Sequence, residues 1–252
     1  MSTTVPMTHT PFDVEETAMD QSAHRVRIAI REVREYAYRA LVVAGASPGE
    51  AMSAAEQVVH AELHEGDGLA GLARTLTRGP WPTQPLTMVR VATGVLDVRC
   101  GDVADELQLS TVLTDLAAGE AGRVCVSTDS SMDVNGLWDS ALVAAAVSTA
   151  ADVVVIGYGD LGRAEVRLAT AAGDLVVGRM PEVHGSPRAA RVEVRVGPSS
   201  RPRDLAVLSR STVAERATRR RQAAQRGVSV DSSTWAVVAD HAKRFLVPEV
   251  DA

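Results

Sequence analysis

The stretch 150–180 constrains the fold more than any other part of the chain, because four structural signals follow one another within it. Val153–Ile156 is a continuous apolar, β-branched run, which is typical of a strand covered on both faces. Three glycines follow at once in the segment Gly157–Gly162, and the segment Arg163–Ala172 predicts a helix. Leu175–Val177 predicts a further strand. The stretch therefore predicts a strand, a glycine turn, a helix and a second strand.

The three glycines have the G-x-G-x-x-G spacing that binds dinucleotides when it lies between a strand and a helix. Gly157 would allow the tight turn, Gly159 would let a pyrophosphate approach the backbone, and Gly162 would let the helix pack closely. Arg179 stands where a ribose-binding acid is expected, and an arginine there suits a 2′-phosphate, so the predicted cofactor is NADP. The alternative is that the glycines serve tight packing alone.

The composition limits the class of protein. The chain has 252 residues and 46% apolar content, which is ample for a buried core. Its 26 basic and 32 acidic residues give a formal charge of −6, which argues against general binding to nucleic acid or to an anionic membrane. Aromatic residues are only 3%, so a platform for stacking bases is not expected. Lys243 is the only lysine, which indicates a GC-rich bacterial genome.

The cysteine count and the chain start indicate a cytoplasmic protein. Cys100 and Cys125 are the only cysteines, too few for a disulfide framework or a zinc site built on cysteine. No charged segment followed by an apolar one opens the chain, and no apolar run approaches the length of a membrane span.

The N-terminal part of the chain predicts helices. Apolar residues recur at helical spacing from His24 to Ala44, which predicts an amphipathic helix. Ser47 and Glu50 then have the spacing of a capping box, and a second helix is expected as far as about Glu65. The two helices should form a hairpin.

Strand and helix patterns alternate through the middle of the chain. A hairpin is expected over 86–99, and helices over 103–118 and 137–149 are separated by strand patterns at 123–126 and 153–156. This order predicts an α/β fold with a parallel or mixed sheet flanked by helices, an N-terminal helical hairpin and C-terminal helices. The expected organisation is a disordered tail at 1–23, a helical region at 24–84, an α/β core with a dinucleotide-binding unit at 85–204, and a C-terminal helical segment at 205–252.

Several short segments resemble the malate/L-lactate dehydrogenase-like oxidoreductases, in the same order along the chain. They are Ala44–Ala51, Ala61–Leu63 leading to Gly71 and Arg74, Ala118–Gly122, and Arg226–Val228. The ending from Trp235 to Glu249 also looks like a related bacterial family of unknown function. The resemblance implies an oxidoreductase fold, a nicotinamide cofactor, a small-molecule substrate and a homodimer. It marks the chain as a degenerate, shortened relative.

The chain departs from that family at its catalytic motif. The family carries a Ser-His-Gly motif whose histidine serves the carbonyl chemistry, and Leu69-Ala70-Gly71 stands at the corresponding place. A second family histidine would fall near Met132. The usual catalytic histidine is therefore absent.

A polar cluster close to the lost motif supplies the catalytic candidates His64, Asp67 and His60. His60 and His64 share one helix face, and an imidazole titrates near neutral pH, so His64 could act as a relocated acid or base. A metal held by the two histidines and a carboxylate is the less favoured alternative to a polar helix end, and no metal is predicted. Asp129, Asp133 and Asn135 follow a strand end and are further pocket candidates.

Three functions are compatible with these residues. The first is an NADP-dependent reductase of a small keto or imino acid. The second is a repurposed tailoring enzyme without redox chemistry, and the third is a non-catalytic partner subunit that has lost the catalytic histidine. A homo-oligomer or a place in a complex is expected, without nucleic acid or membrane partners.

Overall fold

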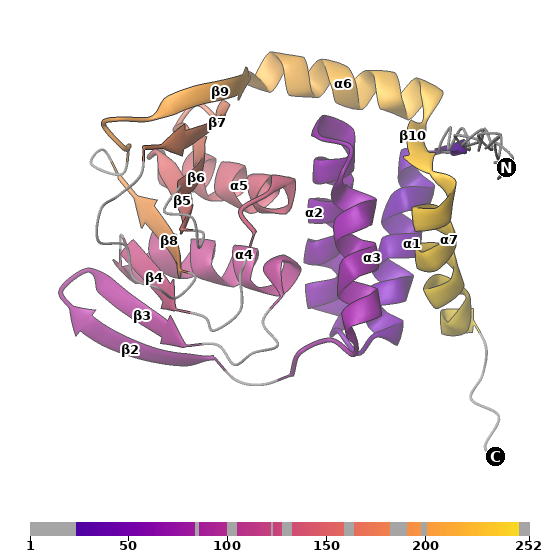
Figure 1. The fold of residues 1–252 in the computed structure, drawn as a ribbon, viewed down its shortest axis with the longest axis horizontal. Coiled ribbons are helices and arrows are strands. Elements are labelled where there is room, and N and C mark those ends of the chain that lie inside the picture. Colours follow the sequence, from indigo (N-terminus) through magenta and orange to yellow (C-terminus); the bar gives the residue numbers. More distant parts are fainter. Residues whose placement is uncertain are drawn as a thin grey trace, which may run out of the picture.

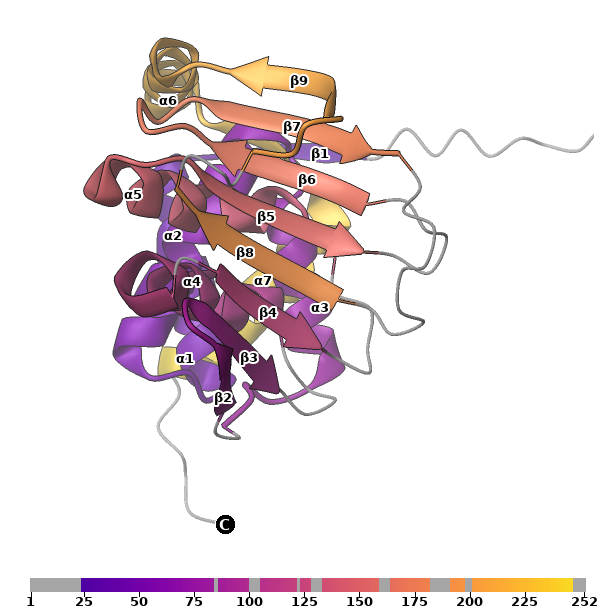
Figure 2. The same cartoon turned by 90° about the vertical axis from the view of Figure 1, so that its left-hand side faces the viewer.

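The chain folds into a sheet covered on one face by two layers of helices. The computed structural model describes residues 24–83, 86–99, 105–121, 123–127, 133–158, 164–181, 191–197 and 201–246. In Figure 1 the sheet lies on the left and most helices stand on the right; Figure 2 shows the strands in front of the helices. The predicted α/β class is confirmed.

The helical layer farther from the sheet contains the N-terminal hairpin and the last long helix. Its members are α1 (Ile30–Val43), α2 (Pro48–His64), α3 (Gly68–Arg78) and α7 (Ser232–Lys243), followed by the 3-10 turn η3 (Arg244–Leu246). The capping box is present: Ser47 Oγ accepts from the Glu50 N–H at 3.3 Å, and the Ser47 N–H donates to Glu50 Oε2 at 2.9 Å. Buried aliphatic side chains of these helices form one core cluster. The predicted helical hairpin is confirmed.

The inner helical layer packs directly on the sheet. It consists of α4 (Glu106–Leu116), the π-helical turn η1 (Ala117–Ala121), the 3-10 turn η2 (Gly136–Trp138) and α5 (Asp139–Thr149). Asp105 caps α4 by accepting from the Leu107 N–H at 2.9 Å. Trp138 and Leu142 are fully buried against the sheet together with Val153 and Val155.

The main sheet has eight strands in the order β2-β3-β4-β8-β5-β6-β7-β9. Among the strands that the structure describes, the pair β3 and β4 alone is parallel, so the sheet is mixed, as expected. The strands are β2 (Thr87–Ala92), β3 (Val95–Arg99), β4 (Arg123–Ser127), β5 (Val153–Tyr158), β6 (Ala164–Ala169), β7 (Leu175–Met180), β8 (Arg191–Val196) and β9 (Ala206–Ser211). The last of these lies inside the segment 205–252, which the sequence predicts as helical.

One helix connects the sheet to the outer helical layer. Figure 1 shows α6 (Val213–Arg226) running from the end of β9 across to β10 (Val228–Asp231). That short strand pairs with β1 (Arg25–Ile28) in an antiparallel ribbon, so the helix predicted from His24 begins only at Ile30. Apart from Arg216, the residues of α6 are exposed or half-buried.

The helix predicted over 163–172 is wrong. Residues Ala164–Ala169 form strand β6, which returns antiparallel to β5, with Gly157 opposite Glu165. The physical reason is an alternation of period two, in which Val166 and Leu168 enter a core cluster while Arg167 lies on the opposite face. The strands β5, β6 and β7 therefore pair antiparallel in order, and residues 164–169 of the predicted helix are a strand.

Candidate active site

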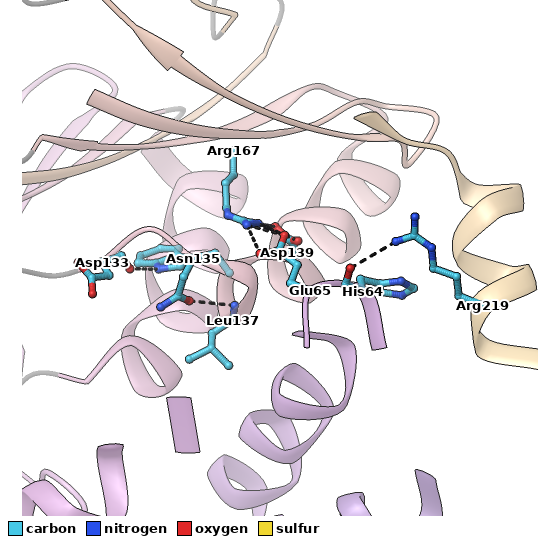
Figure 3. A network of polar contacts seen from close by, with 9 residues as sticks. His64, Glu65, Asp133, Asn135, Leu137, Asp139, Arg167 and Arg219 are labelled. Atoms are coloured by element: carbon cyan, nitrogen blue, oxygen red, sulfur yellow. Dashed lines mark hydrogen bonds and ion pairs between the residues drawn. The ribbon is translucent and has the colours of Figure 1, made fainter. Parts of the chain in front are cut away.

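Three elements that are distant in sequence bring charged side chains together between the sheet and the helices. Glu65 follows the last residue of α2, Asp139 begins α5, and Arg167 lies on β6 in register with Val155 and Val177. Because Val155 faces the inner helices, Arg167 faces them too. Figure 3 shows its guanidinium pointing from the strand toward both carboxyl groups.

The guanidinium of Arg167 makes bonds to both acids. Its Nη1 donates to Asp139 Oδ1 and Oδ2 at 3.0 Å and to Glu65 Oε1 at 2.6 Å, and its Nη2 donates to Glu65 Oε2 at 2.5 Å. The side chains of Arg167 and Asp139 are only 5% and 3% exposed, whereas that of Glu65 is 28% exposed. Charge-assisted bonds of this kind fix the geometry of all three groups.

The protonation of Asp139 is set by its burial. Loss of water raises the pKa of the Asp139 carboxyl to about 8; Arg167 opposes this shift, while the charge of Glu65 adds to it. Glu65 and Asp139 share the single guanidinium of Arg167, and the charge of Glu65 disfavours a second negative charge on Asp139. The Asp139 carboxyl therefore takes up a proton more readily near neutral pH than an exposed aspartate does.

A cleft of about 330 Å³ opens beside this cluster, between α2, α6 and the β7–β9 edge of the sheet. Its lining includes the three charged residues above and three further arginines, Arg210, Arg216 and Arg219. The remaining walls are His64, Leu175, Val177, Ser209 and Ser211. The cleft therefore combines a buried carboxyl of raised pKa with a strongly basic wall.

Of the predicted catalytic residues, His64 lies in the cleft. Burial, together with the positive charges of Arg216, Arg219 and Arg220, lowers the pKa of its imidazole to about 4. His64 is therefore neutral at pH 7. Its Nδ1 is buried without a hydrogen-bond partner, while its backbone oxygen accepts from Arg219 Nη1 at 3.3 Å.

His60 lies one helical turn before His64, and the two rings meet edge to face with centroids 4.5 Å apart. Burial and the neighbouring His64 lower the pKa of His60 to about 3. His60 does not line the cleft. Its ring packs against the ring of His64.

Asp67 lies close to the cluster but not in the lining of the cleft. An added Cβ at Gly136 would stand 3.2 Å from Asp67 Oδ1 and 3.0 Å from Glu65 Oε2, so this glycine leaves room for both carboxyl groups. Burial raises the pKa of Asp67. Its side chain does not cap α3; Glu62 Oε2 does so by accepting from the Leu69 N–H at 2.9 Å.

The predicted nucleotide-binding glycines are described only at Gly157, because Gly159 and Gly162 lie outside the described residues. A Cβ at Gly157 would stand 2.6 Å from Val134 Cγ2, so this glycine is required for close packing. Arg179 lies in the same row of the sheet as Gly157, two strands away, and pairs with Glu165 at 3.4 Å on the surface. The helix start that motivated a pyrophosphate site is replaced by a strand, so binding at these residues stays a prediction that rests on their spacing alone.

The other pocket candidates have structural tasks where they are described. Asn135 Oδ1 accepts from the Leu137 N–H at 3.0 Å and caps η2. The Asp133 backbone oxygen accepts from the buried Trp138 ring at 3.2 Å. Asp129 lies outside the described residues.

Sequence reasoning missed Asp139 and Arg167 as site residues; Glu65 belongs to the polar cluster beside His64, and Arg216 to a basic run on the helix expected over 212–226, for which a solvated face and a phosphate-bearing partner are the alternatives. A signal existed for Arg167, which stands alone as a basic residue within the apolar run Val166–Ala169. Asp139 is a carboxyl at the start of an alanine-rich helix and reads as a helix-end charge. Only the fold shows that these residues converge.

The fold is that of a known group of dehydrogenases. The structure is similar to malate dehydrogenase from Pyrococcus horikoshii OT3, with a TM-score of 0.62 and 11% identity over 89% of this chain and 97% of that chain. It is also similar to sulfolactate dehydrogenase from Methanocaldococcus jannaschii, with a TM-score of 0.59 and 10% identity over 87% and 97% of the two chains. A dehydrogenase from Sinorhizobium meliloti gives a TM-score of 0.58 and 14% identity over 87% and 100%. The family resemblance is therefore confirmed at the level of the fold.

Neither the family models nor the curated proteins contain a match to the sequence. Within the described ranges, no group of three or more His, Cys, Asp and Glu side chains could hold a metal ion. None of the helices in these ranges is long and apolar enough to cross a membrane.

Proposed function

We propose that this chain is a divergent oxidoreductase that reduces a small keto or imino acid in the cleft, with a nicotinamide nucleotide, NADP by preference, as the reductant. The observation that carries the proposal is the convergence of Glu65, Asp139 and Arg167 at a basic cleft, where burial raises the pKa of the Asp139 carboxyl. The fold shared with dehydrogenases supports it.

The groups of the cleft fit a polar anionic ligand. His64 Nδ1, Arg167 Nε and Ser211 Oγ are buried without a hydrogen-bond partner, and His64, Arg167 and Ser211 all line the cleft. Buried polar atoms are normally paired, so these three atoms are suited to bonds with a bound molecule. The backbone at Gly157 fits a phosphate less well, because Val134 occupies the space beside it.

Each residue of the cleft would have a separate role in the reduction of a carbonyl or imino group. When bound, the nucleotide would supply a hydride to the carbonyl or imino carbon. Asp139 would deliver the proton to the oxygen or nitrogen, Arg167 would hold that carboxyl in place, and the neutral ring of His64 would hydrogen-bond the substrate. His60 would position His64, and Asp67 would be an alternative carboxyl for proton transfer. The predicted nucleotide contacts at Gly157, Gly159, Gly162 and Arg179 belong to this proposal as well.

A nucleotide titration and a steady-state assay test the proposal. Isothermal titration should give NADPH binding well below millimolar concentration, and NADPH oxidation should be measurable with a panel of small 2-oxo acids. Asp139→Asn should lower kcat by about 100-fold or more, the range expected for loss of a general acid. Asp240→Asn makes the same change on the exposed face of α7 and should leave kcat unchanged. The wild-type kcat should fall above about pH 8, where Asp139 loses its proton.

Two results would remove this function. If neither NADPH nor NADH binds at millimolar concentration, the redox reaction fails. If Asp139→Asn turns over at the wild-type rate, the proton comes from another group, for which His64→Ala and Asp67→Asn are the next variants.

The second candidate is a protein without redox activity, either a tailoring enzyme that uses His64 or Asp67 or a non-catalytic subunit. It is favoured by Ala70, which carries no reactive group at the place where the resembling family has its catalytic histidine. Binding of a small acid without turnover would support this candidate. The predicted cytoplasmic location and homo-oligomer stay predictions; sedimentation velocity tests the second of them.

A further inference from the structure

Three guanidinium groups on one side of the cleft lack carboxylate partners, and we call Arg210, Arg216 and Arg219 the arginine wall. Arg216 donates to the backbone oxygens of Ser211, at 2.6 Å, and of Gly173. Arg219 donates to the His64 backbone oxygen at 3.3 Å. No ion pair joins any of the three to an acid in the part of the chain that the structure describes. None of the three therefore has a carboxylate in direct contact, although Asp139, Asp174 and Glu215 act on Arg216 through their charge.

The acids near the arginine wall are engaged elsewhere. Glu65 and Asp139 are both held by Arg167. Asp174 acts on Arg216 through its charge, but its Oδ1 accepts from the Val213 N–H at 3.1 Å. Glu215 closes the capping box with Thr212 at the start of α6. The backbone N–H groups at the start of α6 thus already have acceptors within the protein. The positive charge that could bind an anion belongs to the arginine side chains of the wall.

Burial of the Arg216 guanidinium disfavours its charged form. Arg216 is 7% exposed, and burial lowers the pKa of its guanidinium. A desolvated cation without a direct ion pair is uncommon in proteins, and a bound anion can supply the missing partner. The unpartnered hydroxyl of Ser211 and the unpartnered Nδ1 of His64 line the same cleft. The cleft therefore offers three arginines without ion pairs and two free polar atoms, beside the carboxyl groups that Arg167 holds.

We propose that the arginine wall is a binding site for a phosphate group. Arg216 and Arg219 are three residues apart on α6 and so project from the same helix face, and Figure 3 shows Arg219 above His64. A single compact dianion with several acceptor oxygens can meet both guanidinium groups and the Ser211 hydroxyl at once. A monocarboxylate brings half the charge and two oxygens, and would leave the wall partly unpaired.

This inference deepens the proposed function, because the phosphate would belong either to the nucleotide or to a phosphorylated substrate of the same cleft. The site itself does not need a redox reaction. The phosphate group is the same chemical group in both ligands, and titrations with nucleotides and with a phosphorylated acid separate them.

The experiment is a set of isothermal titrations of the full chain with inorganic phosphate, acetate, NADPH, NADH and phosphoglycolate. Phosphate should bind and acetate should bind at least tenfold more weakly. Arg219→Gln and Arg210→Gln should each weaken phosphate binding by about tenfold, the effect of losing one charged hydrogen bond. Both side chains are exposed, so these variants are expected to fold. Arg221→Gln removes the same charge from the same helix outside the cleft and is the matched control.

The nucleotides and phosphoglycolate identify the source of the phosphate. Preference for NADPH over NADH that disappears in Arg219→Gln assigns the wall to the 2′-phosphate. Tighter binding of phosphoglycolate than of either nucleotide, lost in the same variant, assigns it to a substrate. The inference is overturned if wild-type protein does not bind phosphate, or if Arg219→Gln and Arg221→Gln bind it equally well.

A second readout follows the histidine in the cleft by NMR. The arginines lower the pKa of His64 through their charge, so a bound anion should raise the pKa of His64 by neutralising them. An unchanged titration of His64 at saturating phosphate would place the anion outside the cleft. If phosphate binds and the His64 pKa rises, but no nucleotide binds or reacts, the site stands and the proposed reductase function fails.

Discussion

The substitution Arg167→Met isolates the energetic role of the buried charge cluster. Methionine keeps most of the side-chain length and apolar surface but removes the guanidinium that contacts Glu65 and Asp139. Breaking a buried ion pair by removing one partner costs about 3–5 kcal/mol, because the other charge stays buried and unpaired. Asp139 is the buried acid here, while Glu65 can reach water.

The size of this loss should depend on pH. Above about pH 8 the Asp139 carboxylate is charged, and the full loss of about 3–5 kcal/mol is expected. At pH 6 the carboxyl can stay protonated in the variant, so the loss should be smaller by roughly 1–3 kcal/mol. The double variant Arg167→Met, Asp139→Asn should recover most of the stability lost at pH 9.

Urea unfolding at pH 6 and pH 9, followed by tryptophan fluorescence, measures these differences. Trp138 is fully buried beside Asp139 and reports on this region. Arg179→Met is the matched control: its ion pair with Glu165 is about half-exposed, and its loss should cost less than about 1 kcal/mol. If Arg167→Met and Arg179→Met lose the same small amount at pH 9, the cluster does not have the energetic role given to it here.

Three further predictions concern single residues. Gly157→Ala places a Cβ 2.6 Å from Val134 Cγ2 and should lower the free energy of unfolding in urea by about 1–3 kcal/mol. Adding Val134→Ala should restore most of this stability, and an unchanged free energy of unfolding in Gly157→Ala would mean that the turn is not tightly packed. The contribution of Asp139 to the free energy of unfolding should fall as pH rises from about 4 toward 8, since the folded carboxyl retains a proton that the unfolded chain has released; the stability of the wild type relative to Asp139→Asn should therefore decrease over this range, and a constant difference would contradict it. The contribution of His60 should fall as pH drops below about 6.5, because the folded imidazole resists the proton that the unfolded chain takes up; the stability of the wild type relative to His60→Gln should therefore decrease toward acid pH, and an unchanged difference would contradict it.

Local signals in the sequence predict the starts of three helices. The capping box of Ser47 and Glu50 places the start of α2 at the residue where the structure has it. Thr212 and Asp231 likewise stand at the starts of α6 and α7. These signals work because a helix cap needs only residues that are near each other in sequence.

The region after β5 could not be predicted in the same way. Residues 163–172 are rich in alanine and follow a glycine turn, so they fit a helix as well as a strand. The deciding factor is the pairing of β6 with both β5 and β7, which buries Val166 and Leu168 on one face of the sheet. Tertiary packing therefore overrides the local pattern here.

The candidate site was predicted in part. His64 could be found because it lies near its partners in sequence, and it does line the cleft. Arg167 is 102 residues from Glu65 and 28 from Asp139, so no spacing rule links the three. Their association depends on where α2 ends relative to the sheet, which is a property of the whole fold.

A crystal structure of the protein grown with NADPH and inorganic phosphate tests the proposed site most directly. A phosphate group, free or part of the nucleotide, should lie within hydrogen-bond distance of Arg216 and Arg219, with the carboxyl of Asp139 facing the same ligand-filled cleft. A structure in which the cleft holds only water while the nucleotide or phosphate binds elsewhere would contradict it.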